Sequence, residues 1–181
     1  MIRNNGPIFL KQGKALSRAS QDVHVVVLGN PCNTNALIAL HHCRELDPLR
    51  FSAMSALDEN RAKAQLAKQA GVSVSDVTNM TIWGNHSSTM FPDFENTKIC
   101  NKSVESFISN RKWLENDFIT TVQQRGAAVI NARGRSSAAS AASACVDHIK
   151  NFLQKTPDGD WFSAAVPSDG RYYDVPKGLV F

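Results

Sequence analysis

The sequence predicts a mixed α/β protein, in which a parallel α/β segment is followed by an α+β segment with the change near residue 54. Residues 23–28 form a continuous run rich in valine, which is typical of a strand in a parallel sheet. A polar turn and a helical pattern follow at once, as they do in a parallel α/β unit. The C-terminal part instead combines long helical patterns with a hairpin pattern.

The first 54 residues are expected to alternate helices with strands. We expect helices over residues 6–19 and 36–40, and strands over residues 23–28 and 50–54, the first strand being buried on both faces. Asn33 or Thr34 is the candidate N-cap of the second helix. Ligands bind at the carboxyl ends of strands in open parallel sheets, so Gly29 and Asn30 are candidate ligand contacts.

Beyond residue 54 the pattern changes to helices and antiparallel strands. We expect a strand over residues 80–83, helices over residues 58–70, 104–130 and 136–153, and a hairpin that pairs 161–166 with 172–181 around Asp169 and Gly170. The long helix is expected to break near Asn110, and Gly71 stands where a helix often ends in the left-handed conformation. Serine and alanine dominate residues 136–144, so another backbone can approach this helix closely.

Composition excludes several classes of protein. With 181 residues and 43% hydrophobic content, the chain can build one substantial core, or one domain with part of a second. The 20 basic residues are scattered among 16 acidic ones, so nucleic-acid binding is not expected. The four cysteines lack metal-site or disulfide-framework spacing. No apolar run approaches the length of a membrane span or a secretion signal, so we expect no membrane partner and a cytoplasmic location.

Three side chains form a candidate acid/base site. His86 follows the predicted strand 80–83 in a polar turn, and Asp58 and Arg61 share one face of a predicted helix. A carboxylate that accepts from one ring nitrogen of a histidine raises the imidazole pKa and leaves the other nitrogen to exchange a proton. An arginine binds a carboxylate through two parallel hydrogen bonds. Each residue also has a structural interpretation: a surface histidine, a helix-capping aspartate and a solvated arginine.

Two further polar features lie next to these residues. Asn30 can donate to a substrate oxygen, and the alternative is that it forms an Asx turn before Pro31. Ser87 and Ser88 adjoin His86, but adjacency in sequence is not the geometry of a nucleophilic triad, and the sequence has no G-x-S-x-G motif. We therefore expect proton transfer rather than serine chemistry.

Four blocks of sequence together resemble a known family. They are Gly-Asn-Pro-Cys-Asn-Thr-Asn at 29–35, Leu-Asp-Glu-Asn-Arg-Ala at 57–62, Ile-Trp-Gly-Asn-His-Ser-Ser at 82–88 and Gln-Arg-Gly-Ala-Ala at 124–128. In order and spacing they resemble the NAD-dependent malate dehydrogenases of the cytosolic type, within the lactate/malate dehydrogenase superfamily. The likeness runs from about Asn5 to Phe181. It implies the C-terminal part of a Rossmann-type dinucleotide-binding domain over residues 1–53 and a substrate domain over 54–181.

The resemblance also implies a reaction and its site. His86 looks like the family's proton acceptor, paired with Asp58, while Arg61 and Asn30 would bind substrate. The positions similar to those that contact NAD are Asn5, Gln12, Leu28, Gly29 and Asn30. Ser137 would lie in the small-residue helix that borders the pocket. The implied reaction is the reversible oxidation of malate to oxaloacetate in the tricarboxylic acid cycle, by a homodimer with NAD as cofactor and without a metal.

The sequence departs from the family pattern in one important respect. It contains no G-x-G-x-x-G motif, and the family's first βαβ units and substrate-selectivity loop precede the position that aligns with Met1. We therefore expect a fragment that lacks both ends of the enzyme, with the apolar strand 23–28 open to further pairing. The alternatives are a catalytically inactive remnant or interaction subunit and, more distantly, a lactate-type dehydrogenase.

Overall fold

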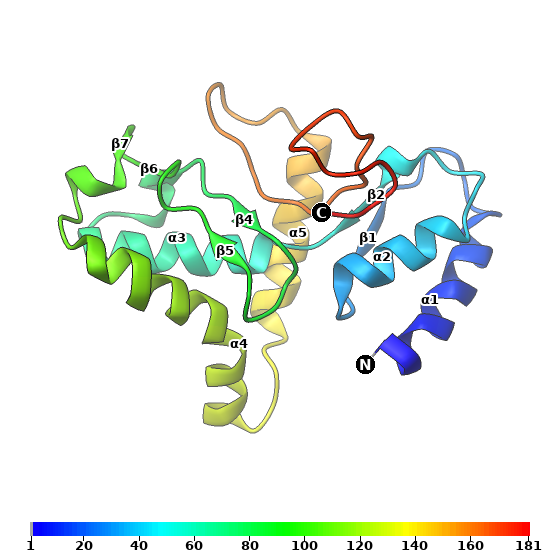
Figure 1. Ribbon diagram of the computed structural model, residues 1–181, viewed down its shortest axis with the longest axis horizontal. Helices are drawn as coiled ribbons and strands as arrows, with labels where there is room; N and C mark the ends of the chain where they lie inside the picture. The colour runs from blue at the N-terminus through cyan, green and yellow to red at the C-terminus, as the bar shows by residue number, and fades with distance from the viewer. Residues whose placement is uncertain (1) are drawn as a thin grey trace. The chain divides into compact units, whose positions relative to one another are not determined.

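The computed structural model describes residues 2–181, which form two compact units (Figure 1). The first unit joins residues 2–54 to residues 164–181, and the second comprises residues 55–163. The predicted domains, 1–53 and 54–181, divide the chain into a cofactor-binding part and a substrate part by resemblance to the family. These two domains stay a prediction. The units defined by internal contacts differ from them because the last 18 residues join the first unit.

A short parallel sheet lies at the centre of the first unit, as the sequence predicts. Its elements are the helices α1 (Ile2–Leu16) and α2 (Cys32–His41), the 3-10 turn η1 (Pro48–Arg50), and the strands β1 (Val25–Val27) and β2 (Phe51–Ala53). Val25 pairs with Phe51 and Val27 with Ala53 in parallel register. The helices α1 and α2 approach closely at Gly13, where an added Cβ would lie 2.4 Å from the carbonyl oxygen of Ala39. Any other residue there would force the helices apart.

The C-terminal segment of the first unit runs antiparallel to itself, but its pairing is shorter than predicted. Val166 and Phe181 exchange both backbone hydrogen bonds, at 2.9 and 3.1 Å, and Pro167 pairs with Val180. Ala165 instead forms an isolated antiparallel bridge to Ala53 at the end of β2. The prediction that residues 161–163 belong to this hairpin is wrong, because they lie in the second unit.

The second unit packs helices around small antiparallel sheets. Its helices are α3 (Ala56–Ala70), the π-helical η4 (Trp113–Phe118), α4 (Ile119–Arg133) and α5 (Ala139–Leu153), with 3-10 turns η2 (Val74–Asp76) and η3 (Val104–Ser106). The strands β3 (Val77–Thr78), β6 (Lys98–Ile99) and β7 (Lys102–Ser103) form one sheet, and β4 (Ile82–Trp83) pairs with β5 (Phe91–Pro92). The fully buried core side chains include Leu66, Met80, Ile99, Leu114 and Phe118.

Several predicted boundaries are wrong for identifiable reasons. The stretch from residue 104 is a 3-10 turn, and helix begins only after Asn110, whose side-chain oxygen accepts from the Trp113 N–H at 3.1 Å. Asn110 is thus a capping residue rather than a break. Helix α2 begins at Cys32 with Pro31 at the N-cap, so Asn33 and Thr34 lie inside the helix.

The first strand is also shorter and less buried than predicted. It covers Val25–Val27 only, and Val27 alone of the three is fully buried. Helix α1 begins at Ile2, four residues before its expected start, and ends at Leu16. The predicted end of α3 is confirmed, because Gly71 adopts the left-handed conformation with φ of 69°. Within residues 2–181 no helix is both long and apolar enough to cross a membrane.

Candidate active site

The first turns of α3 carry a buried carboxylate that contacts two basic groups. The Asp58 side chain is 1% exposed, and its Oδ1 accepts a hydrogen bond from Arg61 Nη1 at 3.1 Å. The i,i+3 spacing on one helix places both side chains on the same face. A carboxylate in the first turn is also favoured by the positive end of the helix dipole. The Asp58 side chain is therefore buried and hydrogen-bonded.

His86 reaches the same carboxylate from the turn that follows β4. Gly84 has φ of 86°, a conformation that favours glycine and turns the chain after the strand. His86 Nδ1 is hydrogen-bonded to Asp58 Oδ2. This bond raises the pKa of His86 above its ordinary value, while partial burial and the nearby Arg61 act in the opposite direction.

The hydrogen bond also fixes how His86 can act. When Nδ1 donates to Asp58, the neutral ring carries its lone pair on Nε2, which can accept a proton. Asp58 then stabilises the imidazolium that results. The His86 side chain is 29% exposed, so a small molecule can reach the ring. This is the geometry of a general base oriented by a carboxylate.

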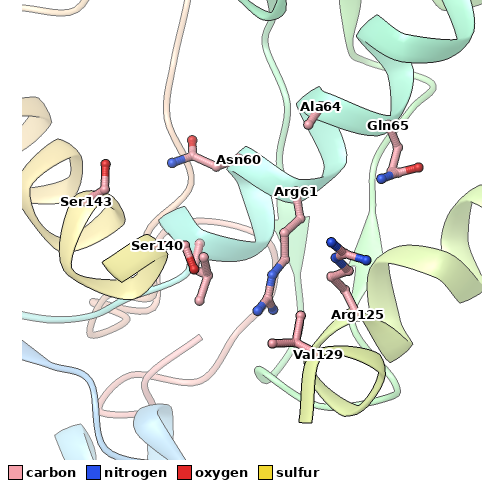
Figure 2. Close-up of a pocket in the computed structure, with 9 residues that line it drawn as sticks. Asn60, Arg61, Ala64, Gln65, Arg125, Val129, Ser140 and Ser143 are labelled. Atoms are coloured by element: carbon pink, nitrogen blue, oxygen red, sulfur yellow. The ribbon is translucent and has the colours of Figure 1, made fainter. Parts of the chain in front are cut away.

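A cavity of about 340 Å³ lies beside Arg61 in the same unit (Figure 2). Helices α3, α4 and α5 supply its lining: Leu57, Asn60, Arg61, Ala64, Gln65, Arg125, Val129, Ser140 and Ser143. Figure 2 shows the Arg61 side chain extending from α3, with the Arg125 side chain beside it from α4. Two guanidinium groups and several neutral donors suit a carboxylate ligand. Arg61 Nη1 binds Asp58, and the guanidinium has further N–H groups that could meet such a ligand.

Sequence reasoning missed several residues of this unit. Arg125 belongs to the family-like block at 124–128, for which the sequence suggested no role, yet it lines the cavity. Ser140 lines the cavity, whereas Ser137 precedes α5 and contacts Ser140 through its hydroxyl. Glu59 is 4% exposed, and burial raises its pKa despite the nearby ammonium of Lys63. Glu59 directly follows Asp58, but a glutamate in a helix gives no sequence signal of burial.

The remaining predicted site residues belong to the first unit. Asn5 Nδ2 donates to the carbonyl oxygen of Asn30 at 2.6 Å, which joins α1 to the turn after β1. Leu28 is 42% exposed at the end of β1. An added Cβ at Gly29 would lie 2.9 Å from the Phe9 ring, so a side chain here would collide with α1. Gln12 is an exposed residue of α1.

Known proteins resemble this chain over nearly its whole length. Residues 55–181 match the lactate/malate dehydrogenase family, alpha/beta C-terminal domain. The chain belongs to this family. A malate dehydrogenase of Magnetococcus marinus is 57% identical over 180 residues, which are 99% of this chain and 54% of that protein.

Solved structures of the lactate/malate dehydrogenase family confirm the predicted fold class. The malate dehydrogenase of Naegleria fowleri matches with a TM-score of 0.90 at 41% identity, over 99% of this chain and 54% of that one. A Trichomonas vaginalis lactate dehydrogenase in complex with NADH and oxamate matches with a TM-score of 0.93 at 34% identity, over 99% and 56%. The chain therefore spans about half the length of these family members.

Proposed function

We propose that this chain supplies the substrate site of an NAD-dependent malate dehydrogenase. The observation that carries the proposal is the contact of Asp58 with both His86 and Arg61. Such a site combines a proton acceptor with a carboxylate-binding group, as oxidation of a 2-hydroxy acid requires. We propose malate rather than lactate as the substrate, because the 57% identical relative is a malate dehydrogenase, whereas the Trichomonas vaginalis lactate dehydrogenase is 34% identical.

The residues of the second unit divide the work of this reaction. Arg61 binds the carboxylate next to the reacting carbon. This contact holds the substrate so that its hydroxyl proton can be removed. His86 Nε2 takes the hydroxyl proton, and Asp58 stabilises the resulting imidazolium through Nδ1. NAD, when bound, supplies the acceptor for the hydride that leaves the same carbon. The reverse reaction returns the proton from His86 to oxaloacetate.

We assign the turn after β1 to the nicotinamide end of the cofactor, as the family resemblance implies. Leu28 offers an exposed apolar surface at the carboxyl end of a parallel strand, where ligands bind in this kind of sheet. Gly29 has no side chain, and the Phe9 ring packs where a Cβ would lie. The carbonyl oxygen of Asn30 accepts from Asn5, and the family resemblance makes Asn30 a proposed substrate contact. These residues, with Gln12 on α1, would hold NAD.

Ligand binding to the chain itself tests the proposal. L-malate titrated into isotope-labelled protein should shift the NMR signals of His86 and Arg61. Arg61→Lys should weaken malate binding about ten- to a hundredfold, because lysine cannot reproduce a charged bidentate contact of roughly 1.5–3 kcal/mol. Arg133→Lys, at an exposed position in the last turn of α4, is the matched control. Equal affinities of both variants would refute the assignment of Arg61.

The alternatives predict different binding. An inactive remnant or interaction subunit should bind neither malate nor NADH, which quenching of protein fluorescence by NADH can detect. A lactate-type enzyme should bind oxamate in preference to malate. The predicted homodimer, the cytoplasmic location and a place in the tricarboxylic acid cycle remain proposals. Light scattering coupled to size-exclusion chromatography tests the first of these.

A further inference from the structure

Ser163 connects the two elements that carry the candidate acid/base pair. The Ile82 N–H in β4 donates to Ser163 Oγ at 3.1 Å, and that hydroxyl donates back to the Ile82 carbonyl at 3.4 Å. Ser55, immediately before α3, donates to the same oxygen at 3.2 Å. Ser163 is 4% exposed, and its hydroxyl uses its one donor and both acceptor positions.

Glu59 completes the connection from the side of α3. Its Oε2 accepts from the Ser163 N–H at 2.8 Å, and its Oε1 pairs with Lys63 Nζ at 2.8 Å. A carboxylate this deeply buried is costly unless its oxygens find partners, and both oxygens are satisfied here. A fully satisfied buried polar network holds its members in one arrangement.

The position of this network matters because of what flanks it. Glu59 follows Asp58 directly, and Ile82 lies four residues before His86. The link from Glu59 through Ser163 to Ile82 thus sets the separation between the start of α3 and the end of β4. Hydrogen bonds weaken steeply with distance and angle, so displacement of either element would weaken the contact between Asp58 and His86.

We propose that Glu59 and Ser163 are positioning residues, which set the proton affinity of His86 by holding β4 against the first turn of α3. This inference rests on the proposed role of His86 and extends it to two residues that take no part in the hydrogen bond between His86 and Asp58. Positioning groups of this kind control a reactive side chain by fixing its hydrogen-bond partner. Asp58 and Arg61 are the charged groups that act on His86.

An NMR pH titration of the His86 ring in the 181-residue chain tests this inference. Ser163→Ala should move the His86 pKa down toward the ordinary value of 6.5, because the Asp58 contact loosens. Glu59→Ala should move it in the same direction. Glu59→Gln should restore it, since the amide oxygen still accepts from the Ser163 N–H. Where Ser163→Ala does not fold, the nearly isosteric Ser163→Cys replaces it, with the same expected shift.

Ser168→Ala is the matched control for a purely structural effect. Ser168 is also a buried serine with two hydrogen bonds to backbone groups, but it lies in the first unit. It should lower the melting temperature without moving the His86 pKa. An unchanged His86 pKa in folded Ser163→Ala and Glu59→Ala overturns the inference. Failure of the proposed function is distinguishable, because the titration needs no substrate and malate binding is measured separately.

Discussion

The second unit contains two histidines in opposite surroundings. His86 lies in a turn, is partly exposed, and is hydrogen-bonded to the buried carboxylate of Asp58, which raises its pKa. His148 lies on α5, is 0% exposed, and packs with its ring centroid 5.0 Å from Phe152 and 6.4 Å from Phe162. Burial lowers the pKa of His148 to about 4.

The difference shows what makes a histidine useful for proton transfer. The surroundings of each histidine set its pKa. Of the two, only His86 combines a carboxylate partner with access for a ligand. His148 is held neutral at pH 7 because its charged form would be poorly solvated. We therefore expect substitution of His86 to affect chemistry and substitution of His148 to affect stability.

The largest expected effect is the loss of turnover in His86→Asn. Asparagine retains a polar side chain but cannot accept a proton, so the rate should fall about 10²–10⁴-fold, the usual contribution of a general base. The measurement is NADH formation from malate by a chimera in which residues 2–181 replace the aligned segment of the Magnetococcus marinus malate dehydrogenase. Unchanged turnover in the variant chimera would contradict the assignment of His86.

His148→Ala should give the next largest effect, and on stability alone. Truncation of a fully buried ring leaves a cavity beside Phe152 and Phe162, which should cost about 2–4 kcal/mol of unfolding free energy. Urea denaturation of the chain measures this cost, with His86→Asn expected to change it by less. If the two variants are equally unstable, the distinction between the two histidines does not hold.

The pH dependence of stability should differ in sign between the histidines. His86 has a raised folded pKa, so its contribution is complete below pH 6.5 and disappears as pH rises through that folded pKa. His148 has a depressed pKa, so its contribution is present above pH 6.5 and disappears as pH falls toward 4, a loss on the order of 2–3 kcal/mol.

Urea titrations between pH 4 and 9 can separate these contributions. The unfolding free energy of each variant is compared with that of the wild-type chain at each pH. His86→Asn should differ from wild type more at the acid end of this range than at pH 9, and His148→Gln should remove part of the acid-side loss. A constant difference across the whole pH range for either variant would show that its histidine does not titrate as proposed.

Local sequence patterns predicted the fold class and the elements whose cause is local. The run of valines predicted a parallel strand, and Gly71 predicted the end of α3, because each signal acts on its own backbone. The candidate site was predictable for a similar reason. Asp58 and Arg61 share a face of one helix, and the polar turn that presents His86 directly follows a strand-like run.

Long-range contacts explain what the sequence did not predict. Ser163 lies 104 residues after Glu59 and 81 after Ile82, and no local pattern marks it as their partner. The pairing of Ala165 with Ala53 likewise depends on how the chain returns to the first unit. His148 was not singled out, because a histidine buried by aromatic neighbours has the same sequence signature as an exposed one.

Only a small effect is expected at Arg111, the arginine with the most ion pairs among the described residues. Arg111 contacts three glutamates, Glu95, Glu105 and Glu115, whereas Arg61 contacts one aspartate. The three glutamates and Arg111 are each about half exposed, so water and salt screen their attraction, while the carboxylate of Asp58 is buried. The number of ion pairs is thus a poor guide to their importance in this unit.

Arg111→Ala should therefore lower the melting temperature by about 2 °C or less at low salt. Most of that change should vanish in 1 M NaCl, where the screening length is only about 3 Å. Lys155→Ala removes an even more exposed pair with Asp158 and should have no measurable effect. Thermal melts followed by circular dichroism check both variants. A salt-independent loss at Arg111 would instead implicate its packing on the Phe94 ring, whose centroid lies 5.9 Å from the guanidinium carbon.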